Sequence, residues 1–171
     1  MDNIQVTDVS AASLAAILGG GESFRVFGEY QVKCHDKDGN LLWEDVAPNL
    51  VTDVGAKLLL DTILAGSAFT ATTYMGLKGT GSAAVADTQA SHAGWLEIGA
   101  ANAPTYTSPR KTVTWSSASG SGAGSRTKPS TGTYTFAITS GSGATVDGCF
   151  LNINGTSAID NATGTLFSAG T

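Results

Sequence analysis

The side chains best suited to catalysis are two histidines, His35 and His92, in a chain of 171 residues. A catalytic histidine needs a nucleophile or an orienting carboxylate within reach. Ser91 and Glu97 lie near His92 in the sequence, but neither spacing matches a known mechanism. We therefore expect His92 to make a local hydrogen bond beside Trp95, and His35 to be an exposed histidine near a turn.

Carboxylates could instead support hydrolysis or hold a cation. The candidates for acid–base work are Glu44 with Asp45, and Glu97 alone, and exposure to solvent explains all three. The segment 36–40 (DKDGN) has the composition of a calcium loop. An EF-hand needs glycine at its sixth position and glutamate at its twelfth, whereas here glycine is fourth and Ala47 is twelfth. The sequence predicts a hairpin turn there, and we expect no catalytic residue, metal ligand or cofactor.

Glycine-rich segments could cradle phosphates. They occur at residues 19–21, 79–81, 120–124 and 141–143. None fits the phosphate-loop pattern, and none fits the dinucleotide pattern that opens a helix after a strand. We therefore interpret all four segments as loops.

The charge balance argues against nucleic acid as a partner. Nine Lys and Arg residues face 14 Asp and Glu residues, for a net charge of −5. The densest basic spot is Arg110 with Lys111. Because binding to nucleic acid depends on neutralising phosphates, we reject it as a primary function.

Membrane and export signals are also missing from the sequence. No stretch of 18 apolar residues is present, and the first residues lack the basic and apolar regions of a signal peptide. We expect synthesis in the cytoplasm, so the acceptor triplets at Asn154 and Asn161 would not be glycosylated. The same compartment favours buried thiols at Cys34 and Cys149 over a disulfide.

Alternating hydrophobicity predicts many short strands. Residues 24–34 alternate apolar and polar side chains, which is typical of a half-buried strand. The Asp38–Gly39 pair then predicts a tight turn, and residues 41–46 a return strand closed by Pro48. Further strands are expected at 72–77, 111–115, 133–139, 146–153 and 165–167.

Two segments have helical patterns. Residues 50–65 carry a broad apolar face, and Thr52 can cap their first turn. Residues 1–21 predict an N-terminal arm, with a short helix at 10–18 that ends in three glycines. The remainder, residues 22–171, is expected to form the β-sandwich domain. The fold class expected is mainly β: an antiparallel, jelly-roll-like β-sandwich with one packed α-helix and an N-terminal arm.

Several pieces of the chain, in order, resemble a family of small tailed-phage virion structural proteins of the capsid-decoration, cement or head-fibre type. The pieces are residues 49–55 (NLVTDVG) leading into 57–61, 74–77 (YMGL), 86–95 (ADTQASHAGW) and 164–170 (GTLFSAG). The resemblance covers roughly residues 24 to 170. It implies a virion role, a β-sandwich and no enzymatic activity.

The resemblance leads to two functional hypotheses. The first is a homodimeric or homotrimeric protein that decorates or cements the capsid shell, bound to the major capsid protein or other virion proteins. The alternative is a tail or head fibre component that contacts the host surface through the loops at 79–86, 116–131 and 140–145. In that alternative Tyr106, Trp115 and Tyr134 could stack on sugars, although core packing is the better explanation for the last two. A small hydrolase has no support from the carboxylates.

The expected contact residues follow from the arm and from the last strand. Members of the family commonly run on after the Ser-Ala-Gly at 168–170. We therefore expect either a shortened chain or an open strand edge, which a neighbour could fill by strand addition. The predicted subunit or capsid contacts are Leu14, Ile17, Leu18, Leu166 and Phe167. A loop predicted to touch a partner contains Ser121, Arg126 and Lys128.

Overall fold

The computed structural model describes residues 3–17, 21–64, 70–107, 109–119, 126–140 and 144–170. Side chains are placed for all of these except residues 3, 6–17, 21–25, 27, 63, 64, 126 and 127. The strands are β1 (Asn3–Ile17), β2 (Gly21–His35), β3 (Leu41–Val51), β4 (Thr73–Gly81), β5 (Trp95–Ile98), β6 (Thr105–Tyr106), β7 (Lys111–Val113), β8 (Arg126–Pro129), β9 (Tyr134–Ser140), β10 (Gly148–Ile153) and β11 (Thr165–Gly170). One helix, α1 (Asp53–Leu64), stands between β3 and β4 in this part of the chain.

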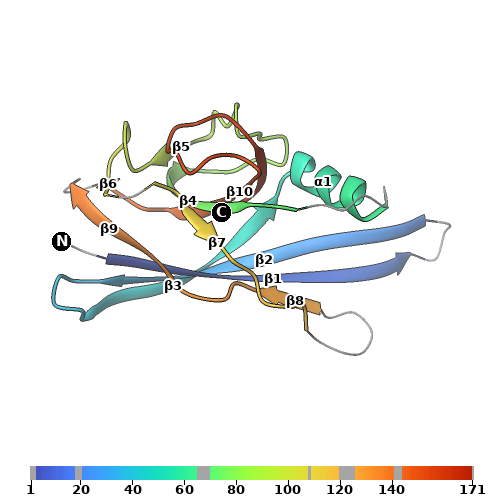
Figure 1. Ribbon diagram of the computed structural model, residues 1–171, viewed down its shortest axis with the longest axis horizontal. Coiled ribbons are helices and arrows are strands. Elements are labelled where there is room, and N and C mark those ends of the chain that lie inside the picture. The colour runs from blue at the N-terminus through green and yellow to red at the C-terminus, as the bar shows by residue number, and fades with distance from the viewer. Residues whose placement is uncertain are drawn as a thin grey trace.

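The strands form one antiparallel sheet that curls until its ends nearly meet (Figure 1). The strand order is β5-β4-β10-β11-β3-β2-β1-β9-β6, while β7 pairs with β4 and β8 with β1. The two ends of this order are joined by the Tyr106 N–H, which donates to the Gly99 carbonyl at 3.2 Å. The expectation of a mainly β, antiparallel protein is confirmed, in a nearly barrel-like form.

The main core lies inside the curl because alternate residues of each strand point to it. In β2, for example, Tyr30, Val32 and Cys34 are buried while Gln31 and Lys33 between them are exposed. The other buried members of this core are Ile4, Met75, Leu77, Ile98, Tyr106, Val113, Phe136, Cys149, Leu151 and Phe167. Both cysteines are buried as thiols, as expected.

A smaller core lies on the outer face of β4, β5, β10 and β11. Trp95, Phe150, Leu166 and Ala169 are buried there. A Cβ on Gly76 would come within 2.4 Å of the Phe150 ring, so this close approach of the ring to β4 requires glycine. The side chains that surround this cluster include many polar ones, and they form the network described below.

Helix α1 begins where the sequence placed its cap. The Thr52 hydroxyl accepts the Gly55 N–H at 3.1 Å, which satisfies one of the donors left open at a helix N-terminus. The helix packs closely on β11, since a Cβ on Gly55 would lie 2.4 Å from the Phe167 carbonyl oxygen. It starts later than expected because residues 49–51 pair with β11 as part of β3.

The helix predicted at residues 10–18 is wrong. Residues up to Ile17 belong to β1, which pairs with β2 from Asn3 opposite His35 to Ile17 opposite Gly21. Leu18 lies outside the described residues. The short apolar run matches a helical stripe by spacing alone, and the non-local ladder with β2 satisfies its backbone groups instead.

The open edge expected at the last strand is also wrong. β11 lies between β10 and β3 and pairs with both of them.

The turn at 36–40 is confirmed: Gly39 has a φ of +86°, and Asp36 Oδ1 accepts the N–H groups of Asp38 and Asn40. The return strand, however, continues past Pro48 to Val51.

Candidate functional site

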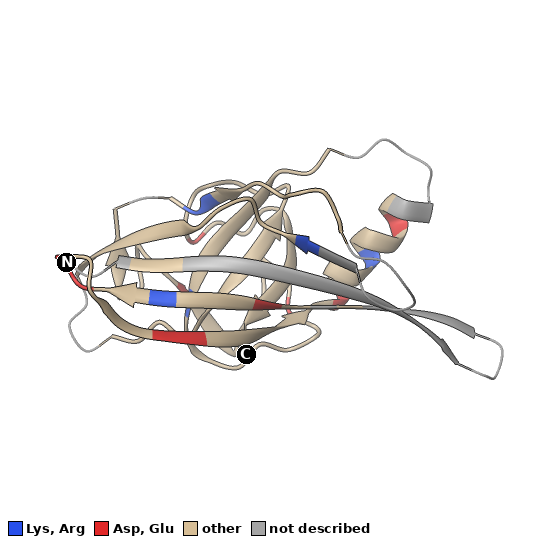
Figure 2. Cartoon of the chain, turned by 90° about the horizontal axis from the view of Figure 1, so that it is seen from below, with Lys and Arg blue, Asp and Glu red and all other residues tan. Residues whose placement is uncertain are grey.

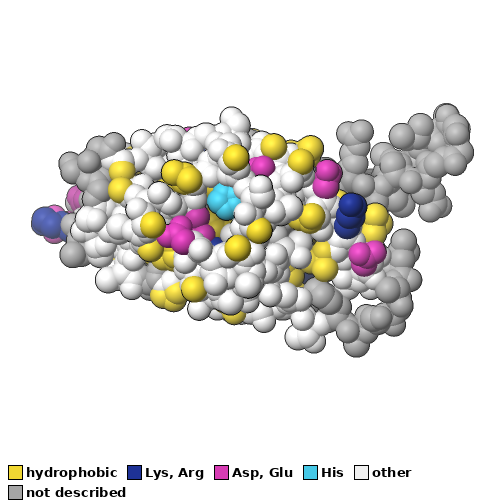
Figure 3. All heavy atoms as spheres, turned by 90° about the horizontal axis from the view of Figure 1, so that it is seen from above, with side chains coloured by type: hydrophobic (Ala, Val, Ile, Leu, Met, Phe, Trp, Pro, Cys, Tyr) yellow, Lys and Arg dark blue, Asp and Glu magenta, His cyan; other side chains and the backbone are white. Residues whose placement is uncertain are grey.

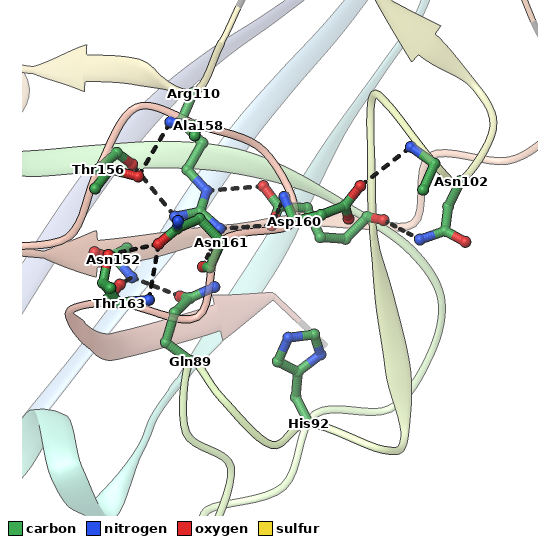
Figure 4. A network of polar contacts seen from close by, with 12 residues as sticks. Gln89, His92, Asn102, Arg110, Asn152, Thr156, Ala158, Asp160, Asn161 and Thr163 are labelled. Carbon is green, nitrogen blue, oxygen red and sulfur yellow. Dashed lines mark hydrogen bonds and ion pairs between the residues drawn. The ribbon is translucent and has the colours of Figure 1, made fainter.

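A buried ion pair stands at the centre of a polar network on the outer face of the sheet (Figure 4). Arg110 Nε donates to Glu97 Oε1 at 2.8 Å, and Nη2 donates to Oε2 at 2.6 Å. Both side chains are almost without solvent exposure, at 0% for Arg110 and 3% for Glu97, so the solvent exposure expected for Glu97 is wrong. Such two-point pairing matches the planar guanidinium to the carboxylate.

The remaining donors of Arg110 reach the loop between β10 and β11. Nη1 donates to the Thr156 carbonyl at 3.3 Å, and Nη2 donates to the Asn161 carbonyl at 2.9 Å. Glu97 Oε2 also accepts the Asp160 N–H at 3.0 Å. The pair therefore fixes residues 154–164 against β5. With its partners all provided by the protein, the carboxylate is placed to hold the loop, and we assign it a structural role.

The loop between β4 and β5 is held in a similar way. Asn152 Nδ2 donates to Gln89 Oε1 at 2.7 Å, and Trp95 Nε1 donates to Asp87 Oδ2 at 3.0 Å. The His92 ring stacks on Trp95 at 4.0 Å, and its Nδ1 lies 3.1 Å from the Trp95 carbonyl oxygen. The local hydrogen bond expected for His92 is confirmed.

Lys78 is the second buried cation among the side chains that the structure describes. Its Nζ donates to Asp147 Oδ2 at 2.9 Å, to the Gly79 carbonyl at 3.1 Å and to the Gly81 carbonyl at 2.5 Å. Three donors thus meet three acceptors, which compensates the burial of the ammonium group. Lys78 ties β4 to the segment before β10.

The described residues hold no cluster of three or more His, Cys, Asp or Glu side chains that could bind a metal ion. Within the same residues, no helix has the length and apolar character needed to cross a membrane.

A different kind of site lies on β3, where large apolar side chains are exposed together. Leu41 is 50% exposed, Leu42 54%, Trp43 42% and Val46 51%. The other large apolar side chains exposed in the described part of the chain are spread over α1, a loop and β5: Leu60, Val85 and Leu96. We call residues 41–47 the β3 edge. Adjacent exposed apolar residues rimmed by charge are typical of contact surfaces.

The β3 edge lacks a described neighbouring strand on one side. β3 pairs with β2 from His35 to Gly28, but β11 meets β3 only at residues 49–51. On the side away from β2, residues 41–47 therefore present backbone donors and acceptors with no strand of the described chain beside them.

The register of β3 and β2 decides which face each side chain occupies. Trp43 is opposite Cys34 and Asp45 opposite Val32, so these two residues share the face of the main core. Leu42, Glu44 and Val46 occupy the outer face. Glu44 and Asp45 are the acidic residues of β3, and Figure 2 shows the acidic part of this strand in red at the margin of the sheet.

Of the two acidic residues of the β3 edge, one forms an ion pair with a lysine and the other does not. Glu44 Oε2 pairs with Lys33 Nζ on β2 at 3.0 Å. Asp45 Oδ1 accepts the N–H of its neighbour Val46 at 2.8 Å, and no ion pair to Asp45 occurs among the described residues. The edge is therefore both apolar and acidic.

The contact residues predicted from the sequence are placed as follows. Leu166 and Phe167 are 0% and 8% exposed and lie in the two cores, so neither side chain is at the surface of the described chain. Their sequence pattern predicts a strand, but only the packed structure shows that both faces of β11 are covered, Leu166 by the smaller core and Phe167 by the main core. Leu14 and Ile17 are in β1 with side chains outside the described set, and Leu18 and Ser121 lie outside the described residues.

The loop residues predicted to touch a partner have a similar outcome. Arg126 begins β8, and its side chain is outside the described set. Lys128 is exposed, and its Nζ donates to the Ser116 carbonyl at 2.9 Å. Its exposure leaves the predicted contact open.

The aromatics considered for sugar stacking are held within the protein. Tyr106 is buried and meets Phe136 edge to face at 5.1 Å. Trp115 Nε1 donates to Thr73 Oγ1 at 3.1 Å, and the Tyr134 hydroxyl accepts the Thr114 N–H at 2.8 Å. Core packing therefore explains Tyr106, and Trp115 and Tyr134 pack against the same core.

Sequence reasoning missed the β3 edge, although a signal was present. Leu41, Leu42 and Trp43 are three consecutive apolar residues, which breaks the alternation of a strand with one solvent face. Such a run indicates a strand that is apolar on both faces.

No family model matches the sequence, and neither the curated proteins nor the solved structures include a significant match to it.

Proposed function

We propose that this chain is a structural protein of a tailed-phage virion that decorates or cements the capsid shell through protein–protein contacts at the β3 edge. The observation that carries the proposal is the exposure of four large apolar side chains, Leu41, Leu42, Trp43 and Val46, beside an unpaired strand edge. Exposed apolar area of this kind is stabilised when another protein covers it.

The polar network supports a structural role for this protein over a catalytic one. Its buried charged residues form hydrogen bonds with each other and with loops of the same chain: Arg110, Glu97 and Lys78. Such bonds hold a surface in one shape, which lowers the entropy lost on docking. Figure 3 shows few charged side chains on one face of the molecule, and charged residues make up 13% of the chain. Weak charge reduces repulsion between many copies on one shell.

The sequence resemblance supports the place of action. It points to the virion as the location, to the major capsid protein or another virion protein as partner, and to a homodimer or homotrimer as the assembled form. In the same family context we propose that the curled sheet is a jelly-roll-like sandwich.

The test compares two surface variants. Leu42→Thr with Val46→Thr removes apolar area from the β3 edge, and Leu96→Thr removes a side chain that is 58% exposed on β5. Both proteins are expected to keep the thermal midpoint of the parent. Each is added to heads that lack this protein, and bound protein and the heat resistance of the heads are measured.

The expected result is lost binding and lost heat protection for the double variant alone. Absence of the parent protein from purified virions would overturn the proposal. Labelled protein found on tails instead of heads would replace capsid decoration with the fibre function. Equal binding of parent and double variant would remove the β3 edge from the proposal.

A further inference from the structure

We infer that the β3 edge accepts an extended strand of another protein, which pairs antiparallel with β3 and places Lys or Arg opposite Asp45. This inference rests on the proposed docking role of the β3 edge, and it adds how the partner binds and what chemistry it carries.

The backbone of the β3 edge requires a strand more than a helix. In an antiparallel pair, alternate residues direct both their N–H and C=O groups toward one neighbour. Since β2 takes one set along residues 41–47, the other set faces the side where no described strand lies. A partner strand satisfies these groups as a helix cannot. The Val46 N–H donates to Asp45 Oδ1 before pairing, and a partner carbonyl that replaces this bond leaves the carboxylate to the basic residue.

The space available also fits a strand. β11 already pairs with the same side of β3 at residues 49–51, and it runs antiparallel to β3. A strand added along residues 41–47 therefore continues the line of β11, at the normal strand separation of about 4.8 Å.

Side chains on both faces of the added strand find apolar surface. On the outer face, Leu42 and Val46 are 54% and 51% exposed. On the core face, Trp43 is 42% exposed, beside the buried Cys34 on the neighbouring strand. A partner strand with apolar residues on both faces covers these side chains as cross-strand neighbours.

Charge selects the partner. Asp45 shares its face with Val32 and has no cation among its described neighbours, whereas Glu44 is paired with Lys33. A basic residue opposite Asp45 supplies the missing charge. A second copy of the β3 edge does not, because residues 41–47 contain Glu44 and Asp45 and no basic residue, so self-pairing brings like charges together.

The experiment uses synthetic strands as probes. A capped nine-residue peptide of valine and threonine, with valines on both faces, carries lysine at its centre. A twin carries glutamate there, and a third is the lysine peptide with alternate backbone amides N-methylated. Backbone amide shifts of the full chain are followed by NMR during titration. An Asp45→Lys variant, checked for an unchanged thermal midpoint, is titrated in parallel.

The lysine peptide is expected to shift the amides of residues 41–47 and to bind roughly threefold more tightly than the glutamate twin. The Asp45→Lys variant reverses that preference, and the N-methylated peptide does not bind. Equal affinity of the two peptides, shifts outside the β3 edge, or no binding overturns the inference. Without peptide, the amide shifts of residues 41–47 could depend on protein concentration while sedimentation shows a dimer. That result would assign the β3 edge to a second copy of the chain and would also overturn the inference.

The two proposals fail separately. Loss of head binding by Leu42→Thr with Val46→Thr, combined with no charge preference among the peptides, keeps the docking function and removes strand addition. The expected peptide result with unchanged head binding keeps strand addition and removes the β3 edge from the capsid role.

Discussion

Arg110 and Glu97 are thirteen residues apart in the sequence and form a two-point ion pair, 2.8 and 2.6 Å long, beneath the loop face of the molecule. The Arg110 guanidinium also lies 5.4 Å from the centre of the Phe150 ring. The pair connects β5, the segment before β7 and the loop from 154 to 164 in one contact. Breaking the pair should therefore weaken the contact between these three segments.

Replacing one member of this pair should be costly. Arg110→Met leaves the Glu97 carboxylate buried without its cation, and we expect the free energy of unfolding to fall by about 3–5 kcal/mol. Arg110→Met combined with Glu97→Met removes both charges and should cost less than the single change. Urea unfolding measures all three proteins.

The matched control for the ion pair is Lys33→Met, which breaks the pair with Glu44. Those side chains are 50% and 61% exposed. Solvent screens this pair, so the loss should stay below about 1 kcal/mol. Similar losses for Arg110→Met and Lys33→Met would contradict the structural role of the buried pair.

Thr52 should matter more than another threonine on the same helix. Its hydroxyl accepts the Gly55 N–H at 3.1 Å and donates to the Leu166 carbonyl, so it caps α1 and ties it to β11. Thr52→Ala should lower the free energy of unfolding by about 1–2 kcal/mol. Thr62→Ala removes only a bond to the Leu58 carbonyl within the helix, and should change it by about 0.5 kcal/mol or less. Equal effects in thermal unfolding would count against the cap.

Alkaline pH should destabilise the protein through Tyr106. Burial raises the pKa of its phenol well above the ordinary value of 10.0, and the Glu97 carboxylate raises that pKa further. With a raised pKa in the folded state, the stabilisation is complete below pH 10.0 and is lost as the pH rises toward the folded pKa. Urea midpoints measured at pH 8 and pH 11 (about three units apart) should therefore differ.

The variant Tyr106→Phe should remove this alkaline loss and keep or increase stability at neutral pH. None of the described residues bonds the buried Tyr106 hydroxyl, so its removal leaves no partner unsatisfied. Tyr134→Phe is the control, since that hydroxyl bonds Thr114, and it should keep the alkaline loss. An unchanged pH dependence in Tyr106→Phe would contradict the assignment.

The turn between β2 and β3 should open in acid. The side-chain amide and the backbone N–H of Asn40 hold the pKa of Asp36 below its ordinary value of 3.8, because they donate to the charged carboxylate. A lowered pKa means that the stabilisation is present above pH 3.8 and is lost as the pH falls through the folded pKa. NMR titration of the Asp36 carboxyl carbon should give a midpoint below 3.8. In Asn40→Ala the midpoint should return toward 3.8, and no movement would exclude Asn40 as the cause.

Local patterns were readable from the sequence by itself. The alternation of β2, the turn at 36–40, the cap at Thr52 and the contact of His92 with Trp95 all join residues a few positions apart. Their partners are set by the geometry of one strand, turn or helix end, so residue type and spacing suffice to predict them.

Only the tertiary structure decided which edges and faces are covered. Residues 10–17 form a strand because β2 pairs with them, although their spacing alone suits a helix. Leu166 is buried because Trp95 and Phe150 pack with it in the smaller core, and Trp43 is exposed on the part of β3 that β11 does not reach. The Arg110–Glu97 pair likewise needs both strands and the distant loop in place. Strand order arises from contacts distant in sequence, and the energy of those contacts depends on the whole sheet, so no local window of residues contains it.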